Sequence, residues 1–400
     1  MILFPWMLTV LFLFSNKDES AEQNKPSRSE ITHRSELTQK GNSGPWGDLT
    51  YTRVLIEPPE DHLEVRFSKN DHFIWIFQDY DEAQLNALWA QAELTSAELD
   101  ILDQPGVKQI EDRKIKITAP KDFVRTMNRK ARTVIYTALS KFPENNPQSE
   151  PFRFNASRRD EWFEGSELKP ESISAISSMF YERGKSVLFS DTNFMMGEIG
   201  TAEQRLLFLK TLARTSTLLV TVQIKPDTDI DTLSNYWGQG PRAKDIQPLL
   251  QSLQRKRTAV AIDIIHFLPP FARSLLYTYP STDDPGSKTY KDCHWTSLNF
   301  FKTIPDPRYE DISEIITEIT EQYHPISGAP KFGDLILFVA DKNDVIHSCV
   351  YIADDIVFTK NGVNPSTPWI LMSLEDVIAN YPSDIPLDIQ RYRRKTTANP

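Results

Sequence analysis

Hydrophobic and polar positions change their period several times over the first third of the chain, and each period predicts one kind of element. Strict alternation predicts half-buried strands, a short apolar run predicts a more buried strand, and apolar residues at helical spacing predict amphipathic helices. The predicted strands cover residues 63–67, 73–77 and 114–117, and the predicted helices cover 81–94 and 120–142. Prolines between 143 and 151 interrupt the pattern, so we expect a small α+β domain over residues 46–150.

After residue 151 helical and strand patterns alternate. The predicted helices cover 170–180, 202–215 and 244–256, and the predicted strands cover 186–189, 218–224 and 259–267. This alternation predicts a second α/β or α+β domain over residues 151–274. Gly238 and Gly240 lie outside the strand–turn–helix setting that a dinucleotide-binding fingerprint requires, so they do not form one.

The chain begins with an apolar run, and a polar stretch follows it. Residues 1–14 are apolar except Thr9, and the first charge is Lys17. The apolar run is shorter than the roughly 20 residues that span a bilayer, and it fits the core of a secretory signal, so we expect export to the periplasm or cell envelope. A buried segment is the alternative. We therefore divide this region into a signal-like segment over 1–20, which serves as a membrane tether if it is not cleaved, and a flexible linker over 21–45.

Composition narrows the classes of function. The chain has 400 residues, more than one ordinary core needs, with 45 Lys and Arg against 55 Asp and Glu. The net charge of −10 disfavours nucleic acid as a partner. Two cysteines cannot form a disulfide scaffold or a four-thiolate zinc site, and no pair of the seven histidines has metalloprotease spacing. We expect no metal and no cofactor. The basic stretch 391–395 we interpret as a solvated end of the chain.

The carboxy-terminal third carries candidate chemistry. Asp292 and Cys293 precede a helical pattern, and strand patterns follow at 333–338, 346–352 and 356–359. A helix start lowers the pKa of a cysteine thiol through unpaired N–H groups, and a histidine on a strand, here His347, can serve as its base.

These motifs resemble the NlpC/P60 cysteine hydrolases. The resemblance covers residues 275–385 and rests on Asp292-Cys293, the Gly333-Asp334 strand opening, and His347 followed by Tyr351-Ile352. It implies a papain-like domain over 275–400, with Cys293 as nucleophile and His347 as base. Members of the family commonly cleave peptide bonds in bacterial cell-wall peptides.

The resemblance also implies further site residues. A third polar residue orients the histidine, and counting along the next strand places it at Thr359, with Asn361 as the alternative after a small shift. A tyrosine before the nucleophile lies near the oxyanion in the family; Tyr279 is the nearest match and Tyr277 competes with it. Cys349 stands where the family has glycine.

Residues two apart on a strand share a face, so we expect Cys349 to point with His347 toward Cys293. It either fills the space of the glycine or forms a disulfide with Cys293, which requires Cα atoms within about 7 Å.

The leading hypothesis is an α+β, multidomain, exported cysteine peptidase or amidase that acts on cell-wall peptides. The alternatives are a catalytically inactive papain-like scaffold of the envelope, and an acyl- or amidotransferase that uses the same Cys293–His347 pair.

Overall fold

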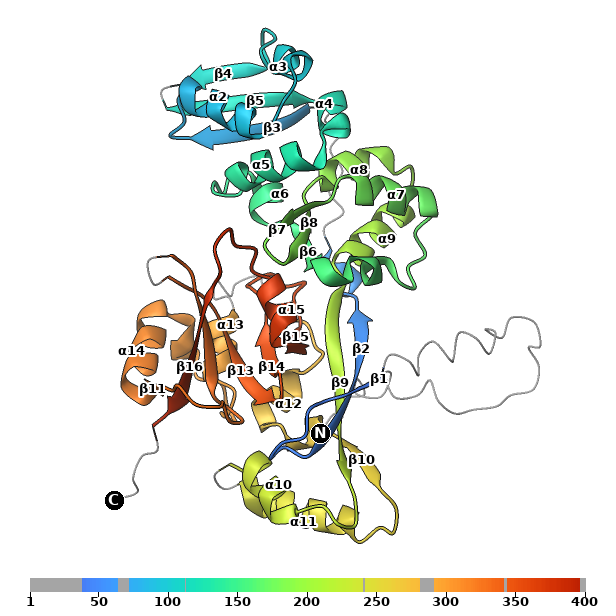
Figure 1. Cartoon of the computed structure of the whole chain (residues 1–400), viewed down its shortest axis with the longest axis vertical. Helices are drawn as coiled ribbons and strands as arrows, with labels where there is room; N and C mark the ends of the chain where they lie inside the picture. Colours follow the sequence, from blue (N-terminus) through green and yellow to red (C-terminus); the bar gives the residue numbers. More distant parts are fainter. Residues whose placement is uncertain are drawn as a thin grey trace, which may run out of the picture. The chain divides into compact units, whose positions relative to one another are not determined.

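The computed structural model describes residues 38–63, 72–111, 113–239, 242–280, 291–341 and 344–395. The signal-like segment, most of the expected linker and all but Leu63 of the strand expected at 63–67 lie outside these ranges. The described residues from Lys40 to Lys395 form one compact unit. Helices and antiparallel sheets are mixed along it, which confirms the α+β class (Figure 1).

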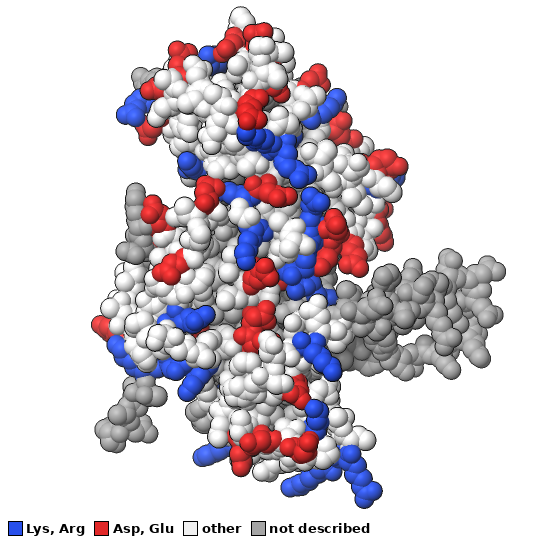
Figure 2. Space-filling model, viewed as in Figure 1, with Lys and Arg blue, Asp and Glu red and all other residues white. Residues whose placement is uncertain are grey.

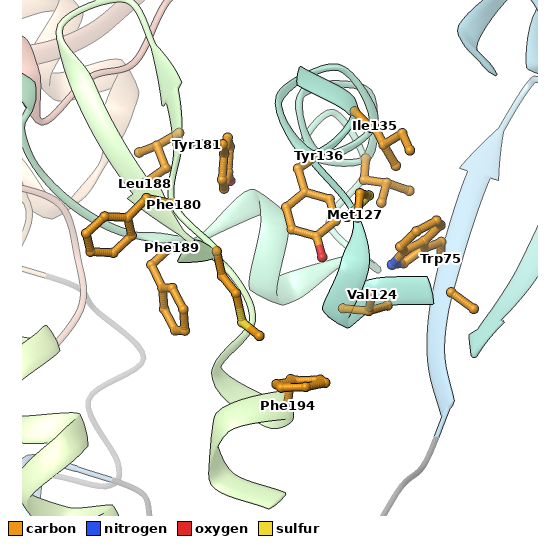
Figure 3. Close-up of a cluster of buried hydrophobic side chains, with 14 of the residues drawn as sticks. Trp75, Val124, Met127, Ile135, Tyr136, Phe180, Tyr181, Leu188, Phe189 and Phe194 are labelled. Atoms are coloured by element: carbon orange, nitrogen blue, oxygen red, sulfur yellow. The ribbon is translucent and has the colours of Figure 1, made fainter. Parts of the chain in front are cut away.

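A first hydrophobic core joins two small sheets, ordered β3-β5-β4 and β6-β8-β7. The strands are β3 (His72–Gln78), β4 (Lys108–Glu111), β5 (Lys114–Pro120), β6 (Phe152–Asn155), β7 (Tyr181–Arg183) and β8 (Ser186–Phe189). The helices are α2 (Glu82–Gln91), α3 (Ser96–Leu102), α4 (Lys121–Thr126), α5 (Arg129–Leu139), α6 (Asn146–Ser149), η2 (Ala156–Phe163), α7 (Pro170–Ser178), α8 (Thr192–Glu198) and α9 (Ala202–Leu212). Trp75, Tyr136, Tyr181 and Phe194 come from four of these elements and lie in the same cluster (Figure 3).

A second core lies around a pair of long strands. β2 (Asp48–Ile56) and β9 (Thr215–Ile224) pair in antiparallel register from Asp48↔Gln223 to Ile56↔Thr215. Around them lie β1 (Thr38–Lys40), η1 (Glu60–His62), α10 (Ile230–Trp237), α11 (Ala243–Gln254), β10 (Val260–Asp263), η4 (Ile264–Phe267) and α12 (Pro270–Leu275). Because β2 and β9 pair directly, the first core is an insertion between them (Figure 1).

The carboxy-terminal third forms a six-stranded sheet in the order β11-β16-β12-β13-β14-β15. Its strands are β11 (Tyr323–Pro325), β12 (Leu335–Val339), β13 (Val345–Ala353), β14 (Ile356–Lys360), β15 (Trp369–Ser373) and β16 (Asp388–Arg394). Its helices are α13 (Cys293–Leu298), η5 (Pro307–Glu310), α14 (Ile312–Gln322) and α15 (Leu374–Ala379). Strands β12 to β15 form an antiparallel meander.

The two faces of this sheet bury different sets of side chains, as period-two alternation requires. Leu337, Val350 and Phe358 join the second core together with Leu298 of α13. Phe338, Cys349, Val357 and other side chains of the opposite face form a third cluster with Val377 of α15. The candidate site lies in this sheet, near the start of β13.

Three expectations about elements need correction. The single helix over 120–142 is two helices, because Asn128 leaves the helix and its side chain accepts the N–H of Ala131 as the cap of α5. The strand over 259–267 ends at Asp263, whose side chain caps the helical turn η4. The basic stretch 391–395 is not a free end, since β16 includes most of it and Arg393 bonds Asp334.

The hydrophobic cores also divide the chain differently from the expected domain ranges. The first core crosses residue 150, and the second crosses residue 274. The antiparallel pairing of β6, β7 and β8 makes the region after 151 α+β at its start. Independent folding of the expected ranges stays a prediction.

Candidate active site

Cys293 is the first residue of α13, as its sequence context predicts. The side chain of Asp292 accepts the N–H of Trp295 at 2.8 Å, which caps the helix. The thiol lies at the sheet-facing start of the helix, and Cys293 is only 6% exposed. The local sequence therefore positions the cysteine, and tertiary packing buries it.

Burial dominates the acidity of this thiol. Burial, and to a smaller extent the charge of Asp292, raise the pKa of Cys293 to about 12. The backbone N–H groups of Ser348, Cys293 and His294 act in the opposite direction. The helix start thus lowers the pKa as expected, but burial outweighs this effect, and the thiol is neutral at pH 7.

His347 lies on β13 and is fully buried. Its Nε2 lies 3.1 Å from Oγ1 of Thr359, and its Nδ1 lies 2.7 Å from the hydroxyl of Tyr381. The ring also stacks on Tyr381, with centroids 4.4 Å apart. Burial, together with the nearby His294, holds the pKa of His347 well below its ordinary value. The imidazole is therefore neutral, with one donor and one acceptor nitrogen.

The partners of His347 fix which nitrogen carries the proton. The hydroxyl of Thr359 donates to Oδ1 of Asn361 at 3.0 Å, so its oxygen accepts from Nε2–H of His347. Nδ1 is then the acceptor, and the hydroxyl of Tyr381 donates to it. We call this directed series Tyr381–His347–Thr359–Asn361 the histidine chain. It includes both candidates for the third residue, Thr359 at the ring and Asn361 behind it.

The strand geometry explains why Thr359 reaches His347. The paired register of β13 and β14 ends at Val350↔Phe358, so His347 and Thr359 come just beyond the ladder on neighbouring strands. Thr359 pairs onward with Ile370 of β15. Beyond the last paired residues of β13 and β14, the side chains of His347 and Thr359 can contact each other.

The structure does not join Cys293 to His347 by a hydrogen bond. In the described part of the chain both ring nitrogens have other partners, Thr359 and Tyr381. The sulfur is nevertheless close enough that a thiolate at Cys293 raises the pKa of Tyr381 and of Cys349. Cys293 and the histidine chain are therefore neighbours that are not directly bonded in this conformation.

Lys360 is a buried cation beside the same thiol, and the sequence reasoning missed it. Its Nζ donates to the carbonyl oxygens of Gly362 at 2.6 Å and Asn364 at 3.2 Å. Burial lowers the pKa of Lys360 to about 8, against the opposing effect of a thiolate at Cys293. A cation here favours a thiolate when one forms. The only sequence signal was its place directly after Thr359.

His294, which follows the cysteine directly, and Tyr381, which the sequence did not indicate, also lie near the site. Nδ1 of His294 lies 3.0 Å from Oγ of Ser348, which itself donates to the carbonyl oxygen of Cys293 at 3.2 Å. This link ties α13 to β13. Tyr381 follows α15 by two residues, and no spacing in the sequence relates it to His347.

The structure places Tyr279 and Tyr277 elsewhere. The ring of Tyr279 packs edge-on against His62 at 5.8 Å, and its hydroxyl has no partner among the described residues. The hydroxyl of Tyr277 donates to the carbonyl oxygen of Leu218 at 2.7 Å. Neither tyrosine contacts Cys293 in the described structure, so neither supports the expected oxyanion role.

The two cysteines are both free and buried, so no disulfide joins Cys293 to Cys349. Cys349 packs in the third cluster, on the sheet face that His347 shares. It fills the position that glycine holds in the resembled family.

Two kinds of feature are absent from the described residues. They contain no group of three or more His, Cys, Asp or Glu side chains arranged to hold a metal ion. Within the same ranges, no helix has both the length and the apolar character to cross a membrane.

No protein-family model, curated protein or solved structure matches this chain. The resemblance to the NlpC/P60 hydrolases therefore rests on the sequence motifs alone.

Proposed function

We propose that this chain is a cysteine hydrolase with a papain-like catalytic domain, and that it cleaves an amide bond with Cys293 as nucleophile and His347 as base. The observation that carries the proposal is the histidine chain. Thr359 and Asn361 hold the proton of His347 on Nε2, which leaves Nδ1 as an acceptor in the neighbourhood of a helix-start cysteine.

The chemistry follows from the neutral states of the two groups. Nδ1 takes the thiol proton as the sulfur of Cys293 attacks the amide carbonyl, so the step is general-base catalysis from neutral partners. The imidazolium then donates this proton to the leaving amine, and water hydrolyses the resulting thioester. The N–H groups of Cys293, His294 and Ser348 surround the sulfur and favour negative charge near it.

Tyr381 sets a condition on this reaction. Its hydroxyl occupies Nδ1, the nitrogen that must accept the thiol proton. The proton can transfer only when Tyr381 releases the ring. The described conformation is therefore a resting state in this proposal.

The substrate and compartment of the proposal come from the resemblance and from the apolar amino end. They are a cell-wall peptide and the periplasm or cell envelope. The second candidate is an inactive papain-like scaffold of the envelope. The raised pKa of Cys293 and the occupied Nδ1 favour it, because both lower the reactivity of the thiol.

The experiment is incubation of the purified chain with isolated cell-wall peptides, read by mass spectrometry of products and of the intact protein. We expect new amine termini and an acyl adduct on Cys293. The Cys293→Ala variant should form neither, and Cys349→Ala should retain both. Identical peptide profiles for wild type and Cys293→Ala, with no adduct, would leave the scaffold function.

A further inference from the structure

A recess lies beside the histidine chain, between the inserted first core and the six-stranded sheet. Its volume is about 420 Å³, within the size range of small-ligand pockets. The insertion contributes residues of α5, α6, β6, β7 and β8. The carboxy-terminal third contributes Ile346 of β13, and Tyr381 and Pro382 from the segment after α15. Ile346 directly precedes His347, and Tyr381 bonds its ring, so one wall of the recess belongs to the candidate site.

Gln148 brings an unused amide to this recess. The residue is 6% exposed, and its backbone N–H bonds the carbonyl oxygen of Asn145. Its side-chain amide has no hydrogen-bond partner in the described part of the chain, and its polar atoms are not sealed from solvent. Buried polar side chains are normally paired, and an amide offers both donors and an acceptor. The recess therefore presents a donor and an acceptor to whatever enters it.

The charged groups of the recess are already paired. Arg153 donates to the carbonyl oxygen of Asn380 at 2.7 Å and lies 3.5 Å from Glu150. Arg183 holds the carboxylate of Asp384 with two nitrogens, at 2.8 and 3.1 Å. Over the wider face of the molecule, cationic and anionic side chains are likewise interspersed (Figure 2). The recess is thus balanced in charge and does not select a strong anion.

Two tyrosines supply apolar wall rather than further polar groups. The hydroxyl of Tyr136 donates to Asp191, and that of Tyr181 bonds Ser190. Both residues line the recess together with Leu188, and all three are almost fully buried. A lining whose charges and hydroxyls are already paired, with one free amide, fits an uncharged chain that carries amide groups.

We propose that this recess binds the peptide backbone of the substrate through the side-chain amide of Gln148, against the wall formed by Tyr381. The inference rests on the proposed amide hydrolase and adds a binding site built by the insertion, outside the part of the chain that resembles the family. A peptide in the recess contacts Tyr381 and so acts on the group that holds His347.

Binding is tested apart from catalysis in the full chain carrying Cys293→Ala. The probe is N-acetyl-tetra-alanine amide, which has no charged end, and the readout is isothermal titration calorimetry. We expect binding that Gln148→Leu weakens at least tenfold, the effect of one well-placed polar pair. Gln148→Met, which is unbranched and close in length to glutamine, is the second variant and should weaken binding equally.

Ser149→Ala is the matched control. Ser149 also lines the recess, but its hydroxyl already donates to the carbonyl oxygen of Asn146. Its removal should leave binding unchanged. Absence of binding to the Cys293→Ala chain, or equal binding by the Gln148 variants, would overturn the inference. The proposed function fails differently, through an unreactive Cys293 in a chain that still binds the peptide.

Discussion

Two tyrosine hydroxyls in this chain bond buried titratable groups, and their surroundings differ. In the first core Tyr136 donates to Asp191 at 2.5 Å, and Arg132 pairs with the same carboxylate. Arg132 also donates to the carbonyl oxygens of Val124 and Met127. We call these side chains the ionic cluster. The guanidinium of Arg132 pairs with the carboxylate of Asp191 within it, and neither cysteine of the chain belongs to it.

The histidine chain is neutral and directed instead. Tyr381 donates to His347, His347 to Thr359, and Thr359 to Asn361. It adjoins a free thiol on one side and a recess on the other. Burial and a tyrosine hydrogen bond are common to both clusters, so these properties alone do not identify a site. The histidine chain differs from the ionic cluster in that Nδ1 of His347 is an acceptor, and the proposed mechanism depends on this nitrogen.

The largest expected effect is on the ionic cluster. Arg132→Met leaves the carboxylate of Asp191 buried without its cation and should lower the free energy of unfolding by about 3–5 kcal/mol. Denaturant titration measures this. The double variant Arg132→Met/Asp191→Leu removes both charges and should recover much of the loss. A loss below about 1 kcal/mol in the single variant would show that the pair is not sealed from water.

In the histidine chain the corresponding change is Thr359→Val, which leaves the Nε2–H of His347 without its acceptor. We expect a loss of about 1–3 kcal/mol, the cost of one buried unpaired donor. Thr359→Ser keeps the hydroxyl and should lose less. Equal losses in both variants would assign the effect to packing rather than to the hydrogen bond.

Mild acid should lower the stability of the folded protein through His347 of the histidine chain. Burial keeps the pKa of His347 well below its ordinary value of about 6.5, so below that pH the unfolded chain binds a proton that the folded chain excludes. Stability should therefore fall as the pH drops below about 6.5, by about 1.4 kcal/mol per pH unit for this group. Unfolding titrations at several pH values should show a shallower fall for His347→Gln. Parallel curves for the two proteins would contradict the buried neutral state.

The sequence predicted those parts of the site that depend on local signals. Asp292 as a cap fixes Cys293 at a helix start, and the strand count from His347 leads to Thr359. Tyr381 could not be found this way, because it reaches His347 through the packing of the segment after α15 on the sheet. The raised pKa of Cys293 follows from burial, which a local pattern does not encode.

The same distinction holds for the fold. Period and punctuation located many helices and strands, since these depend on neighbours in the sequence, but they missed others such as β2, α14 and β16. The pairing of β2 with β9 joins Asp48 to Gln223 across the whole insertion, and no local sequence pattern predicts this pairing. The expected boundaries at 150 and 274 fell inside the cores for this reason.

The most direct test of the account is the rate of Cys293 alkylation by iodoacetamide as a function of pH, in wild type, Tyr381→Phe and Tyr381→Phe/His347→Gln. Removal of the Tyr381 hydroxyl frees Nδ1 of His347, so Tyr381→Phe should label Cys293 at least tenfold faster than wild type near neutral pH. The added His347→Gln change should cancel this gain, and Cys349, fully buried, should stay unlabelled in all three. Equal rates in wild type and both variants would show that His347 does not act on Cys293 and would contradict the proposed mechanism.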